Sequence, residues 1–150
     1  MARPLLRGDR LLAAREAAGM TREDLALALG LSSPARLRVW ESGLERPRPR
    51  LIPLLAAALG VEPLHLLDAD LDDPSLAALR LAAGRATNEM AAPGVSVMTY
   101  VRLEDGRPGT ELTADLVHAV AGLLRVDVAR VEAAIRRSRI DHAASASSGR

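Results

Sequence analysis

The chain repeats itself, and this repeat limits the folds open to it. Residues 11–19, LLAAREAAG, match residues 76–84, LAALRLAAG, at an offset of 65. Residues 55–61 match 120–126 at the same offset. Two segments between them also recur: 30–32 matches 94–96 at an offset of 64, and 39–43 matches 102–106 at an offset of 63. A chain of 150 residues therefore divides into two small units, and recurrence at a fixed period indicates two copies of one structural element.

The composition favours helices for both copies. Alanine and leucine dominate, aromatic residues make up 1% and phenylalanine is absent. Both abundant residues are strong helix formers, and strands prefer the aromatic and β-branched residues that are scarce here. We therefore predict an all-α protein and exclude a β-sandwich. The absence of cysteine also excludes disulfides, thiolate metal sites and a thiol nucleophile.

All 20 basic residues are arginine, and the net charge is +1. Coding bias in a GC-rich genome would produce this usage without any functional cause. A preference for phosphates or guanine edges, which guanidinium groups bind in a bidentate manner, would produce it as well. Composition alone does not separate the two interpretations.

Charge and small residues mark the expected boundaries. Four aspartates fall within residues 68–73, just before Pro74, and such a run indicates a solvated connection. The last residues are rich in serine, alanine and glycine, so we expect a frayed tail. The predicted division is a first domain over 1–68, an acidic linker over 69–74, a second domain over 75–137 and a flexible tail over 138–150.

Helix-ending residues in the first copy predict five short helices. Gly19, Gly30 and Gly60 each follow an apolar run, where a glycine commonly ends a helix. Thr21 and Asp24 have capping-box spacing, which predicts a helix over 22–29. The remaining helices are expected before residue 19, over 33–42, up to residue 59 and over 63–68.

The residues around Gly30 have the pattern of a helix-turn-helix. Ala26 is small where two helices would touch, Gly30 is free to take a positive φ in the turn, and Leu37 and Trp40 would anchor the second helix on its inner face. Together with segments 18–26, 30–32, 40–43 and 56–61, they resemble the phage-repressor, Cro-like or XRE-type helix-turn-helix DNA-binding domains. The resemblance implies two small lambda-repressor-like bundles in tandem, the second one degenerate.

The resemblance also implies which residues would contact DNA. Helix 33–42 would be the recognition helix, with Trp40 in the core and Glu41 bonded near the first helix. Residues 30–43 hold one residue more than is usual in the family, which leaves the register of this helix open by one. The expected base-contacting residues are Ser33, Pro34, Ala35, Arg38 and Val39. The expected phosphate-contacting residues are Arg22, Arg36, Arg46, Arg48 and Arg50.

The second copy departs from this pattern. Residues 1–68 hold ten arginines and eight acidic residues, whereas 69–150 hold ten arginines and eleven acidic residues. A surface of low positive charge meets phosphates poorly, so we expect this copy to dimerise or bind a partner, with reading of a neighbouring half-site as the alternative. The face on which this depends comprises Val97, Met98, Thr99, Val101 and Arg102. The last helix, after Asp127, could support the same interface through Val128, Val131 and Ile135, or pack on its own domain.

Three classes of function compete. The first is a sequence-specific transcriptional regulator that binds double-stranded DNA as a homodimer, in the cytoplasm at the nucleoid. The second is a protein-interaction adaptor or antitoxin-like component that keeps the fold but binds DNA weakly. An enzyme is not expected, because no phosphate loop or nucleophile-with-base pattern is present. No cofactor and no membrane association are expected, and His65, His118 and His142 are too scattered for a metal site.

Overall fold

The protein is all-helical over the residues that the structure describes, 5–148. This computed structural model confirms the predicted fold class, and the described residues contain only two isolated β-bridges and no strand. The elements are α1 (Gly8–Ala17), α2 (Arg22–Leu29), α3 (Ala35–Ser42), α4 (Leu51–Leu59), η1 (Pro63–Leu66), α5 (Leu76–Ala82), η2 (Thr87–Glu89), α6 (Val97–Glu104), α7 (Ala114–Leu124) and α8 (Val128–Ser148).

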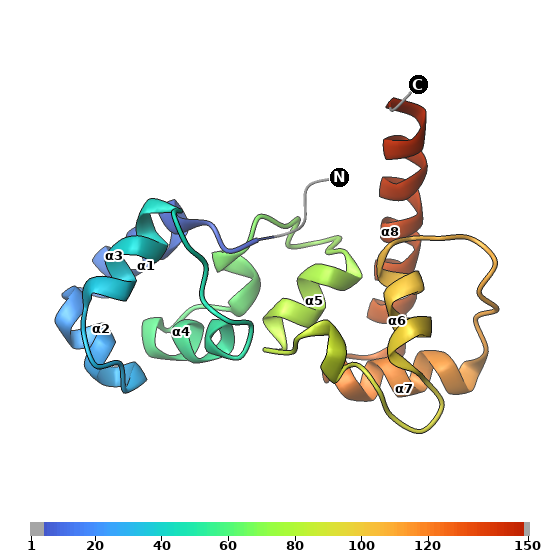
Figure 1. The fold of residues 1–150 in the computed structure, drawn as a ribbon, viewed down its shortest axis with the longest axis horizontal. Helices are drawn as coiled ribbons and strands as arrows, with labels where there is room; N and C mark the ends of the chain where they lie inside the picture. Colours follow the sequence, from blue (N-terminus) through green and yellow to red (C-terminus); the bar gives the residue numbers. More distant parts are fainter. Residues whose placement is uncertain (1–4, 149–150) are drawn as a thin grey trace.

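Two hydrophobic clusters divide the molecule along its long axis (Figure 1). The first is built by α1–α4 and η1, which we call the N-terminal half (residues 5–68), and the second by α5–α8, the C-terminal half (residues 75–148). The halves are in contact, because α5 packs against both α4 and η1. Leu64 is partly buried against both clusters.

The N-terminal half follows the expected helix boundaries at α2 and at the end of α3. The Thr21 hydroxyl accepts a hydrogen bond from Asp24 N at 3.0 Å and the Asp24 carboxylate accepts one from Thr21 N at 3.0 Å, which completes the capping box of α2. Gly30 ends α2 with φ +69° and Gly43 ends α3 with φ +80°. The fifth predicted helix, 63–68, is a shorter 3-10 turn, Pro63–Leu66.

Backbone hydrogen bonds tie the two ends of the N-terminal half together. Arg7 N donates to Leu66 O at 2.7 Å, and Asp68 N donates to Leu5 O at 2.8 Å. This short antiparallel bridge fixes the start of α1 beside η1 and closes the bundle on itself.

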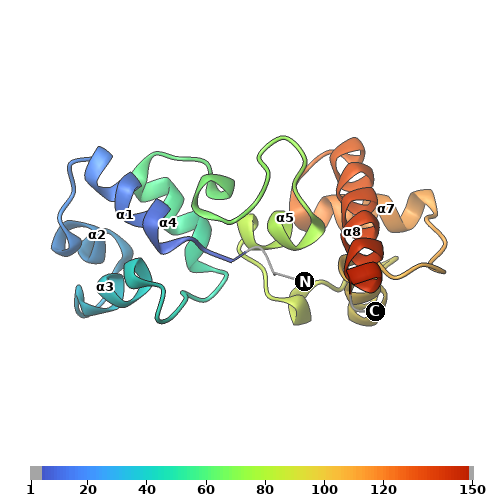
Figure 2. The same cartoon turned by 90° about the horizontal axis from the view of Figure 1, so that it is seen from above.

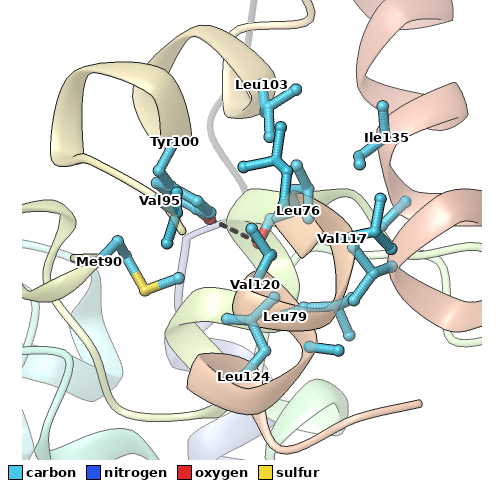
Figure 3. Close-up of a cluster of buried hydrophobic side chains, with 14 residues drawn as sticks. Leu76, Leu79, Met90, Val95, Tyr100, Leu103, Val117, Val120, Leu124 and Ile135 are labelled. Atoms are coloured by element: carbon cyan, nitrogen blue, oxygen red, sulfur yellow. Dashed lines mark hydrogen bonds between the residues drawn. The ribbon is translucent and has the colours of Figure 1, made fainter. Parts of the chain in front are cut away.

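The C-terminal half packs around Tyr100, which is fully buried (Figure 3). Its hydroxyl donates to Leu76 O at 3.4 Å, and burial raises the pKa of this phenol above its ordinary value. Where the repeat predicts a counterpart of α2, the structure has only the three-residue turn η2. Pro93 follows closely and lacks the backbone N–H that a longer helix would need. The described residues therefore lack a second two-helix motif, and the tandem arrangement stays a prediction.

Helix α8 corrects the expected tail. The segment 138–148 continues the helix instead of fraying, and Gly149 and Arg150 lie outside the described residues. Ser138 is fully buried: its hydroxyl donates to Ala134 O at 3.0 Å and accepts from Leu76 N at 3.4 Å. The hydroxyl thus satisfies a backbone group at the start of α5, which compensates for a polar residue inside the core.

The apolar face of α8 packs on its own half. Val131 and Ile135 are 0% and 1% exposed, and both belong to the C-terminal cluster, with Val128 packed against it. The alternative expectation, that this face supports an interface with another chain, is therefore wrong.

Candidate nucleic-acid interface

Helix α3 presents one face to solvent and buries the other. Leu37 and Trp40 are 0% and 3% exposed, and they anchor α3 in the N-terminal cluster. Pro34 precedes the first turn, and the Ser33 hydroxyl accepts a hydrogen bond from Ala35 N at 3.1 Å. The expected recognition helix thus begins two residues later than predicted, at Ala35. The outward residues are Ser33, Ala35, Arg36 and Arg38, which are exposed, and Pro34 and Val39, which are half-buried.

A depression lies between the start of α2 and the start of α3. We call it the α2–α3 depression. It brings together Arg22 with four of the five expected base-contacting residues. Its lining includes Thr21, Arg22, Ser33, Pro34, Ala35 and Arg38.

A second depression gathers the remaining expected phosphate-contacting residues beside the carboxyl-terminal end of α3. We call it the arginine depression. Four arginines from the segment 36–50 line it, together with Trp40 and Glu45. All four are exposed: Arg36, Arg46, Arg48 and Arg50. Residues of α3 thus line both depressions, Arg38 the α2–α3 depression and Arg36 the arginine depression.

Below this face, the buried carboxylate of Glu41 joins three helices. Its side chain is 2% exposed and accepts hydrogen bonds from Arg15 Nε at 2.6 Å, Arg15 Nη2 at 3.3 Å and Arg22 Nε at 3.1 Å. The hydrogen bond to Glu41 raises the pKa of Arg15. The network fixes α3 relative to α1 and α2, the structural role expected for Glu41. It also shows that Arg22 is partly neutralised within the chain.

The C-terminal half contains the same ion pair at the matching positions of the repeat. Arg80 Nε donates to Glu104 at 2.8 Å, as Arg15 does to Glu41, and the two arginines also donate from Nη1 to the carbonyls of Arg85 and Met20, each at 2.9 Å. Sequence reasoning overlooked both arginines. The signal was present, because Arg15 and Arg80 occupy the same column of the repeat.

The surface of α6 differs in character from that of α3. Met98 is 67% exposed, Arg102 is exposed, and Val97, Thr99 and Val101 are half-buried. We call these five residues the α6 face. Exposed acidic residues follow it in the chain, namely Asp105, Glu111 and Asp115. In Figure 2, α3 and the gold helix α6 lie toward the same long side of the molecule.

Residues 5–148 contain neither a cluster of metal ligands nor a helix suited to a bilayer. No three histidine, aspartate or glutamate side chains converge there in a way that could hold a metal ion. None of the helices in this range is both long and apolar enough to cross a membrane.

Comparison with known proteins assigns part of the chain to a class. Residues 11–66 match the family model described as "Helix-turn-helix", a range that runs from within α1 to the end of η1. No curated protein and no solved structure matches the chain. The match supports DNA binding and transcription regulation at a general level for this part of the chain.

Proposed function

We propose that this chain is a sequence-specific transcription regulator in which α3 enters the major groove of double-stranded DNA, in the cytoplasm at the nucleoid. The observation that carries the proposal is the exposed face of α3, whose residues line two depressions, one together with Arg22 and the other together with Arg46, Arg48 and Arg50. A helix fits the major groove of B-DNA, and the arginines beside it would neutralise the phosphates on either side.

Base reading is assigned to the exposed side of α3. Arg38 is exposed and lines the α2–α3 depression, and one guanidinium can donate to both O6 and N7 of guanine. Ala35 and Val39 offer methyl groups to a thymine methyl, and Ser33 and Pro34 would lie at the edge of the groove.

Phosphate binding is assigned to the arginines at both ends of α3. Arg36, Arg46, Arg48 and Arg50 would contact one strand from the arginine depression. Arg22 would contact the other strand from the α2–α3 depression. A guanidinium has five N–H donors, so the bond from Arg22 Nε to Glu41 leaves donors for a phosphate.

Selection of binding sites from random DNA at about 0.1 M salt tests the proposal, because specific binding persists at such ionic strength. We expect an enriched motif. Arg38→Ala should weaken binding by about 1–3 kcal/mol and relax preference at one base pair, whereas Arg48→Ala should weaken all sequences alike and lower the salt slope by about 1. Arg136→Ala, at an exposed position of α8, is the matched control and should change neither. Absence of an enriched motif contradicts the proposal.

We further propose that the C-terminal half forms a homodimer through the α6 face, which would place two copies of α3 on an inverted repeat. The support is Met98, which is 67% exposed on this face. Exposed apolar side chains that cluster commonly mark protein contacts. Met98→Glu should abolish a dimer detected by sedimentation. A monomeric wild-type chain that contacts two adjacent DNA sites would instead favour the half-site alternative.

The second candidate function is a protein-interaction adaptor or antitoxin-like component. The acidic residues that follow the α6 face favour it, because Asp105, Glu111 and Asp115 would repel phosphates and attract a basic partner. This candidate predicts weak binding to all DNA sequences and a stable complex with another protein. The selection experiment separates the two, since only the regulator yields a motif.

A further inference from the structure

The two halves are in contact at Gly84, two residues after the end of α5. Gly84 has φ +75°, and a Cβ on it would lie 2.8 Å from Pro53 Cγ, 3.1 Å from Pro53 Cδ and 3.5 Å from Arg50 Cα. A methyl group at this position would therefore press against the first turn of α4. Leu81 and Ala82, just before it, pack against the N-terminal cluster and keep the contact in place.

The segment that Gly84 touches also carries the arginine depression. Arg50 is the residue that precedes α4, and no side chain caps this end of the helix. Leu51 N donates to Arg48 O at 2.9 Å and Ile52 N donates to Pro49 O at 3.0 Å, so one tight turn joins the arginines of the loop to the helix. A shift of the first turn of α4 would thus move Arg48 and Arg50 together.

We propose that Gly84 is a positioning residue: through it, the C-terminal half sets the start of α4 and the placement of Arg48 and Arg50 against the phosphate backbone. The proposal rests on the function proposed above. It gives the C-terminal half an effect on DNA binding that requires no contact between that half and DNA.

Gly84→Ala in the full chain tests the proposal against a matched control. Gly60 has nearly the same backbone angle, φ +70°, and ends α4, but a Cβ on it would meet nothing within 4 Å. Both substitutions place a non-glycine residue in the left-handed region and share that backbone strain, to which Gly84→Ala adds the clash with Pro53. We expect only Gly84→Ala to lower the slope of log affinity against log salt, by about 0.9 for each phosphate that the variant no longer neutralises. Equal slopes for the two variants would overturn the proposal.

A compensating substitution makes the test independent of folding defects. Pro53→Ala removes the two ring carbons nearest to Gly84, so alone it should also loosen α4 and lower the slope. Combined with Gly84→Ala, the added methyl group takes the place of the missing ring atoms, and the slope should return toward that of the wild type. Additive losses in the double variant would contradict the inference. Should Gly84→Ala fail to fold, an unchanged slope in Pro53→Ala overturns the proposal alone.

Trp40 supplies a readout that needs no DNA. It is the single tryptophan of the chain and lines the arginine depression with Arg36, Arg46 and Arg50. Trp40 is only 3% exposed, so neutral acrylamide should quench it weakly while the segment that carries Arg46 and Arg50 stays in place. Displacement of this segment should raise acrylamide quenching of Trp40, and we expect this in Gly84→Ala but not in Gly60→Ala. If the wild type does not bind DNA, the proposed function fails, and unchanged acrylamide quenching still refutes the positioning role.

Discussion

Removal of the Glu41 carboxylate should lower the free energy of unfolding of the N-terminal half more than removal of any exposed charge does. Glu41→Ala leaves Arg15, whose side chain is 10% exposed, without its partner in the core. Breaking a buried pair from one side costs about 3–5 kcal/mol, because the remaining charge is desolvated and uncompensated. A unit of this size has a total unfolding free energy of roughly 3–10 kcal/mol, so the variant should be partly unfolded at room temperature.

Urea denaturation followed by Trp40 fluorescence measures this loss. Trp40 lies in the N-terminal cluster and Tyr100 in the C-terminal one, so each half has its own optical reporter. With an m-value of about 1–1.5 kcal/mol/M, the Trp40 midpoint should fall by roughly 2–5 M. Glu16→Ala, which removes the same charge from an exposed position of α1, should change the unfolding free energy by less than about 0.5 kcal/mol.

The reasoning is refuted if Glu41→Ala and Glu16→Ala unfold at the same urea concentration. A double variant tests the cause. Arg15→Met with Glu41→Met replaces the pair by apolar side chains, which is often neutral or stabilising relative to a buried ion pair. The double variant should therefore recover most of the stability that Glu41→Ala loses. If it is as unstable as the single variant, the uncompensated charge of Arg15 is not the cause.

Three further predictions concern other parts of the fold. Burial raises the pKa of Tyr100, so on alkaline titration the unfolded chain releases the phenol proton before the folded chain does. The contribution of Tyr100 to the free energy of unfolding is therefore complete below the unfolded pKa of about 10, and above it declines by about 1.4 kcal/mol per pH unit. Alkaline titration of unfolding should show this slope in the wild type and lose it in Tyr100→Phe; an equal slope in both would contradict it. Thr21→Ala removes the cap of α2 and should cost about 1 kcal/mol, measured by urea denaturation. Glu45→Gln, at an exposed loop position, is the control and should cost less than about 0.5 kcal/mol. Ser138→Ala leaves Leu76 N without its acceptor and should cost about 1–3 kcal/mol; a neutral effect would argue against docking of α8 on α5.

Local chemistry allowed the N-terminal half to be predicted well. The capping pattern of Thr21 and the glycines at 30, 43 and 60 act through short-range geometry, so the sequence around each is sufficient. The ion pair between Arg15 and Glu41 depends on two residues 26 positions apart, and only the Glu41 side of it was expected. Of the residues expected to contact bases, the structure exposes Ser33, Ala35 and Arg38 and half-buries Pro34 and Val39. Their contacts with DNA remain predictions.

The C-terminal half was harder because its departures from the repeat depend on long-range packing. A terminal segment rich in serine, alanine and glycine looks like a tail, because it has few large apolar residues to pack against a core. What keeps 138–148 helical begins with the burial of Ser138 against Leu76, 62 residues away. The spacing of Val131, Ile135, Ser138 and His142 along one helix face was the available signal. Similarly, Pro93 was the local warning that a counterpart of α2 would be cut short.

The shared position of Leu64 has a thermodynamic consequence. This side chain packs against both clusters. The stability of the chain is therefore described by three free energies: one of unfolding for each half alone, and one that couples the two halves. Fragments separated within the acidic stretch would then have unfolding free energies whose sum falls short of the intact chain by that coupling. The half with the lower free energy of unfolding is stabilised by its contact with the other half. A destabilising substitution in either core should therefore also lower the melting temperature of the other half.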